Sequence, residues 1–201
     1  MNRIAPALAF VLALLAGLPA GAGSPKEALE GASAKIKKAV AKPAAKGSAA
    51  EKKIKEEVRT VVTQFLDYTE LARRAMAKFW DERSDAEKTE FAGILKDLIE
   101  ASYLGKISGN ADYSVEFLEE SDDGGDAYVL TKLSAKAGSV NVGFKLHKKG
   151  DRWLCFDLLI DEVSTLRTYK SEFNKIIKDQ SYAALVRKMK DKLEETKKSD
   201  K

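Results

Sequence analysis

Apolar residues recur every three or four positions through the first half of the chain, which is the pattern of amphipathic helices. Residues 51–65 form the first predicted helix of this region. Asp67 and Ser84 are typical N-cap residues, each with a glutamate three positions later, and they predict two more helices, the last ending near Gly105. The apolar stripes contain Ile54, Val58, Val61, Val62 and Phe65, then Leu71, Ala75, Phe79 and Trp80, then Phe91, Ile94, Leu95, Leu98 and Ile99.

After Gly109 the apolar period changes to two, which predicts β-strands. Turn sequences at residues 122–125, near Gly138 and at residues 149–151 divide this region into four strands in meander order. Residues 153–160 are apolar at nearly every position, which is typical of a strand covered on both faces in the middle of a sheet.

Helical spacing returns after the strands and predicts two C-terminal helices, one from Leu166 and one from Tyr182, followed by a charged tail from Asp191. Helices, then an antiparallel sheet, then helices make an α+β fold. We expect one domain over residues 51–195, with residues 196–201 outside it.

The N-terminus has the pattern of a secretory signal peptide. A positive start ending at Arg3 precedes an apolar run over residues 4–18 and a small-residue cleavage site at Ala20 and Ala22. The run is shorter than the roughly 20 residues of a membrane-spanning helix, so a membrane anchor is the less favoured alternative. We expect cleavage near Ala22 and an exported protein, in the periplasm of a double-membrane cell or outside it.

Residues 23–50 are rich in alanine and lysine. Residues 26–40 carry apolar positions at loose helical spacing, which indicates an extra helix, and the remainder is expected to be a flexible link. Two interpretations of the basic residues stay open. They are either attracted to anionic lipid heads or belong to a solvated, weakly ordered arm, which is the favoured alternative.

Composition excludes several classes of function. The 201 residues contain one cysteine and one histidine, Cys155 and His147, which leaves no zinc cluster, no disulfide framework and little material for a nucleophile paired with a histidine. The 35 basic and 31 acidic residues nearly balance, unlike those of a dedicated nucleic-acid binder. We therefore expect no metal site, no catalytic residues and no nucleic-acid partner, and we expect Cys155 to be buried and inert.

Two polar residues in the predicted strands are candidates for chemistry. The parity of His147 places it on the polar face of its strand, so we expect it to be solvated. Asp157 lies inside an apolar strand on the parity of Trp153 and Cys155. We expect it to be a structural aspartate bonded to a tyrosine or to backbone amides, and a raised-pKa acid is the alternative. The acidic run at residues 119–126 lacks the ligand pattern of a calcium loop and is expected to be a solvated turn.

Two stretches of the sequence resemble the MlaC family, also called the toluene-tolerance auxiliary family. The first is Leu66-Asp67-Tyr68-Thr69-Glu70-Leu71-Ala72-Arg73 with the later Phe79-Trp80, and the second is Phe156-Asp157-Leu158-Leu159-Ile160-Asp161-Glu162-Val163-Ser164 with Tyr169-Lys170-Ser171-Glu172-Phe173. The resemblance runs from about Glu51 to Met189. Departures from the family pattern include Ala77 and Glu162, which stand where the family usually has glycine, and also Thr168, Lys170 and Glu172.

The resemblance implies a periplasmic phospholipid carrier with no cofactor. Its partners would be an inner membrane ABC transporter with an MCE-domain protein and an outer membrane lipoprotein complex. The implied fold is cone-like, similar to nuclear transport factors, with helices closing an apolar pocket on a curved sheet. On this basis we expect the pocket to be lined by Phe65, Phe79, Tyr103, Val115, Phe117, Val129, Leu133, Val142, Phe144, Tyr169 and Phe173. Arg73, Arg74, Arg167 and Lys170 are candidates for a positive rim, and the alternative is that these charged helix faces are solvated and bind nothing.

Two other interpretations stay open, because periodicity alone does not separate a filled core from a lined cavity. One is an enzyme on a cone-like fold that uses Asp157. The other is an interaction module whose core is filled and binds no ligand.

Overall fold

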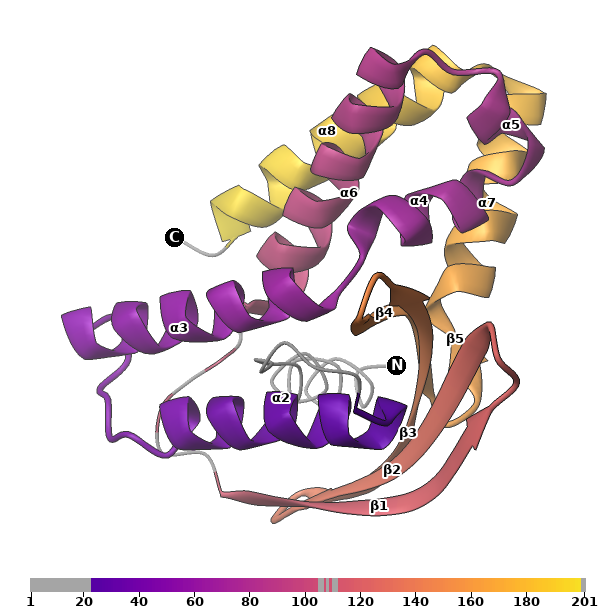
Figure 1. Cartoon of the computed structure of the whole chain (residues 1–201). Helices are drawn as coiled ribbons and strands as arrows, with labels where there is room; N and C mark the ends of the chain where they lie inside the picture. Colours follow the sequence, from indigo (N-terminus) through magenta and orange to yellow (C-terminus); the bar gives the residue numbers. More distant parts are fainter. Residues whose placement is uncertain (1–22, 105–106, 108, 110–111, 200–201) are drawn as a thin grey trace.

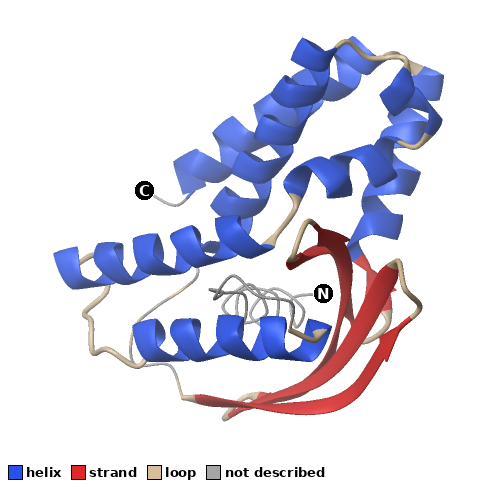
Figure 2. Ribbon diagram, in the orientation of Figure 1, coloured by secondary structure: helices blue, strands red, loops and turns tan. Residues whose placement is uncertain are grey.

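Helices and one antiparallel sheet follow each other in the predicted order, helices first, then the sheet, then helices (Figure 1). The computed structural model describes residues 23–104, 107, 109 and 112–199. The predicted signal peptide and its cleavage site lie outside these residues. Figure 2 shows the helices gathered on one side of the sheet and beyond its end. In the described part of the chain, no helix combines the length and the apolar character needed to cross a bilayer.

Among the described residues, five helices precede the sheet and two follow it. The first five are α2 (Pro25–Val40), α3 (Ala49–Phe65), α4 (Tyr68–Met76), α5 (Lys78–Asp81) and α6 (Asp85–Leu104). The last two are α7 (Thr165–Asp179) and α8 (Tyr182–Ser199). The predicted caps are confirmed, since Asp67 accepts from the Glu70 amide at 3.0 Å and Ser84 and Glu87 form a capping box. The expected tail from Asp191 is wrong, because α8 continues to Ser199.

The residues after Asp67 were expected to form one helix that included Phe79 and Trp80, but the structure divides them into α4 and α5. Ala77 ends α4 and begins α5 with φ of 52° and ψ of −127°. Residues with a side chain rarely adopt this backbone conformation. The local pattern does not predict this break, because alanine favours helix and the apolar spacing continues across Ala77.

Most of residues 23–50 form helix α2, which spans Pro25–Val40. Ser24 and Glu27 make a capping box at its start, and Leu29 and Ile36 are fully buried, so the helix alternative is observed and the weakly ordered arm is wrong. The curved sheet wraps around α2, which contacts β1, β2 and β4 (Figure 1). The backbone amide of Lys26 also donates to the Glu120 carboxylate at 2.8 Å. The packed core therefore begins before residue 51, where the domain was expected to start.

The sheet has five strands in the order β1-β2-β3-β4-β5 rather than the four that were predicted. They are β1 (Tyr113–Asp122), β2 (Asp126–Ala135), β3 (Gly138–Lys149), β4 (Arg152–Ile160) and β5 (Val163–Ser164). β5 has two residues, too few for an apolar period to reveal. β4 is buried on both faces, as expected, but its second strand neighbour is only this short β5. The rest of its outer edge meets the α3–α4 connection, where the Asp67 amide donates to the Cys155 carbonyl at 2.8 Å.

A β-bulge in β4 changes which residues share a face. Cys155 lies opposite Leu146 and Asp157 lies opposite Lys145, so Phe156 is the extra residue between them. Because Leu146 and Lys145 point to opposite faces of β3, Cys155 and Asp157 do too. The expected shared parity of Asp157 and Cys155 is therefore wrong, since period-two reasoning assumes a regular strand.

The two positions where glycine is usual in the resembled family both have positive φ here: Ala77 at 52° and Glu162 at 68°. We expect Ala77→Gly to raise the free energy of unfolding by about 1 kcal/mol, because glycine removes the steric strain of the Cβ atom. Urea denaturation measures this change. Ala34→Gly is the matched control, at an exposed position of α2 with ordinary helical geometry. Its free energy of unfolding should fall by about 0.5–1 kcal/mol. Equal losses in both variants would contradict the assignment of strain at Ala77.

Candidate functional site

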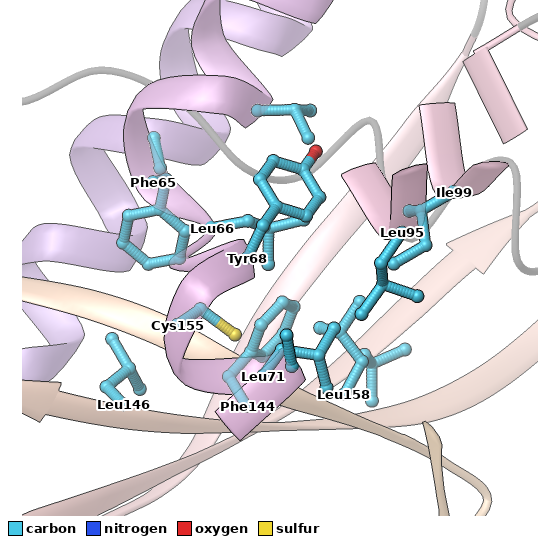
Figure 3. Packing of buried hydrophobic residues seen from close by; sticks show 14 of the residues in the cluster. Phe65, Leu66, Tyr68, Leu71, Leu95, Ile99, Phe144, Leu146, Cys155 and Leu158 are labelled. Atoms are coloured by element: carbon cyan, nitrogen blue, oxygen red, sulfur yellow. The ribbon is translucent and has the colours of Figure 1, made fainter. Parts of the chain in front are cut away.

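An apolar cavity of about 30 Å³ lies where β4 meets α4, α6 and the start of α7. Its walls are formed by Leu66, Leu71, Ile99, Tyr103, Phe156, Asp157, Leu158, Ile160 and Thr165. Figure 3 shows Leu71, Ile99 and Leu158 within one cluster of apolar side chains contributed by α4, α6 and β4.

The volume of this cavity decides what it can hold. A water molecule occupies about 30 Å³ in the liquid, whereas ligand pockets usually measure about 300–1,000 Å³. The cavity of about 30 Å³ is therefore too small for an acyl chain in this arrangement. A larger ligand would enter only if α4 or α6 moved away from β4.

Most of the predicted pocket residues do not line this cavity but lie on the sheet face that α2 covers, where Val142 and Phe144 pair with the wall residues Ile160 and Leu158. They are Val115, Phe117, Val129, Leu133, Val142 and Phe144, with Phe65 of α3 buried in the same cluster. Val129, Val142 and Phe144 are completely inaccessible to solvent. These side chains are in contact with other side chains of the core, and their contact with a ligand stays a prediction.

The remaining predicted residues belong to the helices. Tyr169 stacks on Phe173 with ring centroids 5.2 Å apart, and Phe173 meets Phe91 edge-on at 5.5 Å, which joins α7 to α6. Phe79 lies on α5, where the Lys78 ammonium is 5.3 Å from its ring centroid. Tyr103 is the member of the predicted set that lines the cavity.

Sequence reasoning missed most of the cavity wall. Phe156, Leu158 and Ile160 belong to the apolar run that was correctly expected to be buried on both faces. This apolar run was the feature of the sequence that could have located the cavity wall. A strand that is apolar on both faces needs a covering element on each face, whereas an alternating strand needs one on a single face. Leu71 and Ile99 lie on the predicted apolar stripes of α4 and α6, but the stripe does not show which neighbour each residue faces.

Asp157 ties β4 to β5 and to the start of α7. Its Oδ2 accepts from the Ser164 hydroxyl at 2.7 Å, and its Oδ1 accepts from the Leu166 amide at 2.8 Å. Ser164 in turn caps α7 by accepting from the Arg167 amide. The structural role expected for Asp157 is confirmed, with a serine hydroxyl and a backbone amide as partners rather than a tyrosine.

His147 is not solvated as expected. Its Nε2 lies 3.2 Å from Asp67 Oδ2, its side chain is only 16% exposed, and its ring meets Phe156 edge-on. Lys149 donates to the same oxygen at 2.9 Å. Burial alone would raise the pKa of Asp67, but the hydrogen bonds from Lys149 and from the Glu70 amide, together with the nearby positive charge, lower it. The polar face of β3 is covered by the α3–α4 connection, which the sequence could not reveal.

Two of the four candidate rim cations, Arg73 and Arg74, lie on α4, and Arg74 joins this helix to the sheet. Arg74 pairs with Asp126 of β2, with Nη2 and Oδ1 2.8 Å apart, and its guanidinium lies 3.7 Å from the centroid of the Phe156 ring. Arg73 and Arg74 both donate to Glu70. Arg167 donates to the Glu162 carbonyl, and Lys170 is exposed.

Cys155 is fully buried, and burial raises the pKa of its thiol well above the ordinary value. Within the described residues, histidine, cysteine and carboxylate side chains do not gather in threes as a metal ion would require. Asp157, the carboxylate in the cavity wall, accepts two hydrogen bonds.

A family model described as MlaC protein matches residues 30–191, from within α2 to within α8. The chain belongs to the MlaC family. The resemblance noted in the sequence is thereby confirmed, and the MlaC match includes most of the helix that covers the sheet. The family description names no catalytic activity.

Among solved structures, a phospholipid-binding protein from Ralstonia solanacearum in complex with a phospholipid is similar to this MlaC-family chain. The TM-score is 0.65 at 19% sequence identity, and the alignment covers 72% of this chain and 83% of that chain. The likeness supports the α+β fold. None of the curated proteins compared with the sequence matches it.

We expect Asp157→Ala to lower the free energy of unfolding by about 3 kcal/mol, because the buried Ser164 hydroxyl and the partly buried Leu166 amide lose their acceptor. Asp157→Asn keeps an oxygen for the Leu166 amide and should lose less. Urea denaturation of both variants checks this. Stability equal to that of the parent in Asp157→Ala would show that the carboxylate is not structural and would reopen the enzyme interpretation.

Hydrogen bonds from Arg73, and to a smaller extent from Arg74, hold the pKa of Glu70 at about 2, below the ordinary glutamate pKa of 4.5. Partial burial of Glu70 opposes this shift. Because the folded pKa is the lower one, this pair stabilises the protein above pH 4.5 and the contribution disappears as the pH falls towards 2. Glu70→Gln should therefore cost about 1 kcal/mol near neutral pH, reduced from the full effect by solvent screening at the half-exposed Arg73. Thermal unfolding across this pH range should show the two proteins converging in acid. Glu194→Gln, at an exposed position of α8, should match the parent at every pH.

Proposed function

We propose that this protein is a periplasmic phospholipid carrier that encloses acyl chains between β4 and the helices packed against it. The observation that carries the proposal is the apolar cavity between β4, α4 and α6 in a chain of the MlaC family. The structural likeness to a phospholipid-binding protein crystallised with its lipid supports it.

Transfer of a phospholipid through water needs a protein because the acyl chains are apolar. Two chains expose about thirty methylene groups, and at about 0.8 kcal/mol each their exposure costs on the order of 25 kcal/mol. A carrier reduces this cost by surrounding the chains with aliphatic and aromatic side chains. The cavity walls are of this kind except for Asp157 and Thr165, and both oxygens of Asp157 already accept hydrogen bonds.

The cavity must grow to hold acyl chains, and the contacts around it allow this. Leu71 and Ile99 meet β4 through apolar surfaces, which are not directional and can re-form around a lipid chain. Closed and open arrangements would then exchange, and a lipid would favour the open one by its greater affinity for it. The structure described here corresponds to the closed arrangement.

The proposal extends to location and partners. The signal-peptide pattern of residues 1–22 supports export to the periplasm. Membership of the MlaC family supports lipid exchange with an MCE-domain protein of an inner membrane ABC transporter and with an outer membrane lipoprotein complex.

Organic extraction of protein expressed in a Gram-negative host, followed by mass spectrometry, should yield phospholipid in a fixed ratio to protein. Ile99→Trp adds bulk to the cavity wall and should lower lipid affinity by about 5- to 150-fold, which corresponds to an overpacking cost of about 1–3 kcal/mol. Leu118→Trp adds similar bulk at a position of β1 that is 43% exposed and should retain lipid.

Transfer of labelled phospholipid from donor to acceptor vesicles should follow the same order. Circular dichroism verifies that each variant is folded, and Ile99→Phe replaces Ile99→Trp if the larger ring prevents folding. Parent protein without extractable lipid and without transfer activity would overturn the proposal. If Leu118→Trp lost as much lipid as Ile99→Trp, the lipid would not bind in this cavity.

A further inference from the structure

Seven exposed lysines gather where α2 ends and α3 begins. They are Lys35, Lys37, Lys38, Lys42, Lys46, Lys52 and Lys53, and we call this part of the molecule the lysine end. We propose that the lysine end binds the surface of an anionic phospholipid bilayer. This inference concerns where the protein docks, not what it carries, so it can succeed or fail independently of the carrier function.

Acidic side chains do little to neutralise the lysine end. Between Gly31 and Lys55 the sequence contains one acid, Glu51, which is 6% exposed and accepts from the Gly47 amide at 2.8 Å. Lys42 pairs with Glu57 at 2.7 Å. The ion pairs among the described residues involve none of the other lysines of this set, which are Lys35, Lys37, Lys38, Lys46, Lys52 and Lys53. Lys53 acts on the Glu57 carboxylate at longer range, and the charges of the other lysines are available to an external anion.

The connection that presents these lysines is folded rather than a loose link. Ser48 caps α3 by accepting from the Glu51 amide, and Gly47 has φ of 78°, a conformation that suits glycine. Gly109 packs so closely that an added Cβ would lie 2.5 Å from the Lys42 carbonyl oxygen and 2.9 Å from Ala44. Because the backbone is already ordered, docking does not have to immobilise it.

The distribution of charge along the molecule gives the docking an orientation. The lysine end and the β1–β2 hairpin lie at opposite ends of the sheet and helix assembly (Figure 1). The hairpin carries the exposed acids Glu119, Asp122 and Asp123. An anionic surface would attract the first end and repel the second.

The composition of the lysine end favours a bilayer over a protein partner. Protein interfaces are enriched in aromatic residues and arginine and depleted in lysine. Residues 31–55 contain no aromatic residue and no arginine. The large apolar side chains that stand out as exposed in the described chain, Leu118 and Val163, lie on other elements. Lysine without apolar anchors is typical of attraction to anionic lipid, where each charge close to the surface strengthens binding about fivefold.

The test is sedimentation with vesicles, using protein expressed from the full sequence, recovered in soluble form and checked by intact mass. Vesicles contain either phosphatidylcholine alone or equal parts of phosphatidylcholine and phosphatidylglycerol. At about 0.1 M salt, where charges act over about 10 Å, the protein should bind the mixed vesicles and not the neutral ones. The binding should be lost at about 1 M salt.

The variant Lys35→Gln, Lys37→Gln, Lys38→Gln and Lys46→Gln should bind the mixed vesicles at least about tenfold more weakly. The matched control removes the same charge from exposed lysines elsewhere by Lys178→Gln, Lys188→Gln, Lys197→Gln and Lys198→Gln, and should bind as the parent does. Lipid extraction from both variants should equal that of the parent, which separates failure of docking from failure of the carrier function.

Three outcomes would overturn the inference. The first is absence of binding to the mixed vesicles, and the second is an equal loss of binding in both variants, which would indicate an effect of net charge alone. The third is binding of polyglutamate without binding of vesicles, which would assign the lysine end to an acidic protein partner.

Discussion

The structure depends on covering the concave face of one curved sheet. That face carries Val129, Val142 and Phe144, and burial of each such side chain contributes about 1.5–3 kcal/mol relative to exposure. Helix α2 supplies the cover with Leu29 and Ile36, both excluded from solvent. A sheet with one uncovered apolar face would be a site of aggregation, so α2 is a required part of the fold and not an appended arm.

Polar contacts determine which helices are attached firmly to the sheet. Asp157 joins the start of α7 to β4, and Arg74 joins α4 to Asp126 of β2. Such bonds have fixed geometry, and breaking one leaves a charged or polar group without its partner. Helix α6 meets the cavity through Ile99 and Tyr103 on the opposite wall. Expansion on the side of α6 would separate apolar side chains of the cavity wall, but α6 is itself held to α3 by the bond from the Thr63 hydroxyl to the buried Glu100 carboxylate, 2.9 Å long.

The sequence predicted most of the elements because local signals specify them. Caps at Asp67 and Ser84 begin helices, and period-two alternation marks four strands correctly. The failures have tertiary causes. The break at Ala77 contradicts the local preference of alanine, and β5 forms only because it pairs with the end of β4. Neither the break at Ala77 nor the two-residue strand β5 changes the spacing of apolar residues in the sequence.

The candidate site was harder to predict than the fold for a related reason. The alternating strands identify a sheet face, but a face can be covered by another element or can line a cavity. The bulge at Phe156 then reverses the parity of everything beyond it, so Cys155 and Asp157 separate onto different faces. The family resemblance named the correct class of protein but did not identify which apolar side chains surround the cavity.

Helix α2 connects the core of the protein with its proposed docking surface. Its buried side chains cover the sheet, while Lys35 and Lys38 on the same helix face solvent. A bilayer can favour an opened arrangement only if it binds that arrangement more tightly than the closed one. Opening at α2 would have to break the contact of Lys26 with Glu120 at one end and the packing of Gly109 against Lys42 at the other. Since the second contact lies within the lysine end, a bilayer bound there would lie beside the segment that follows α2 and packs against Gly109.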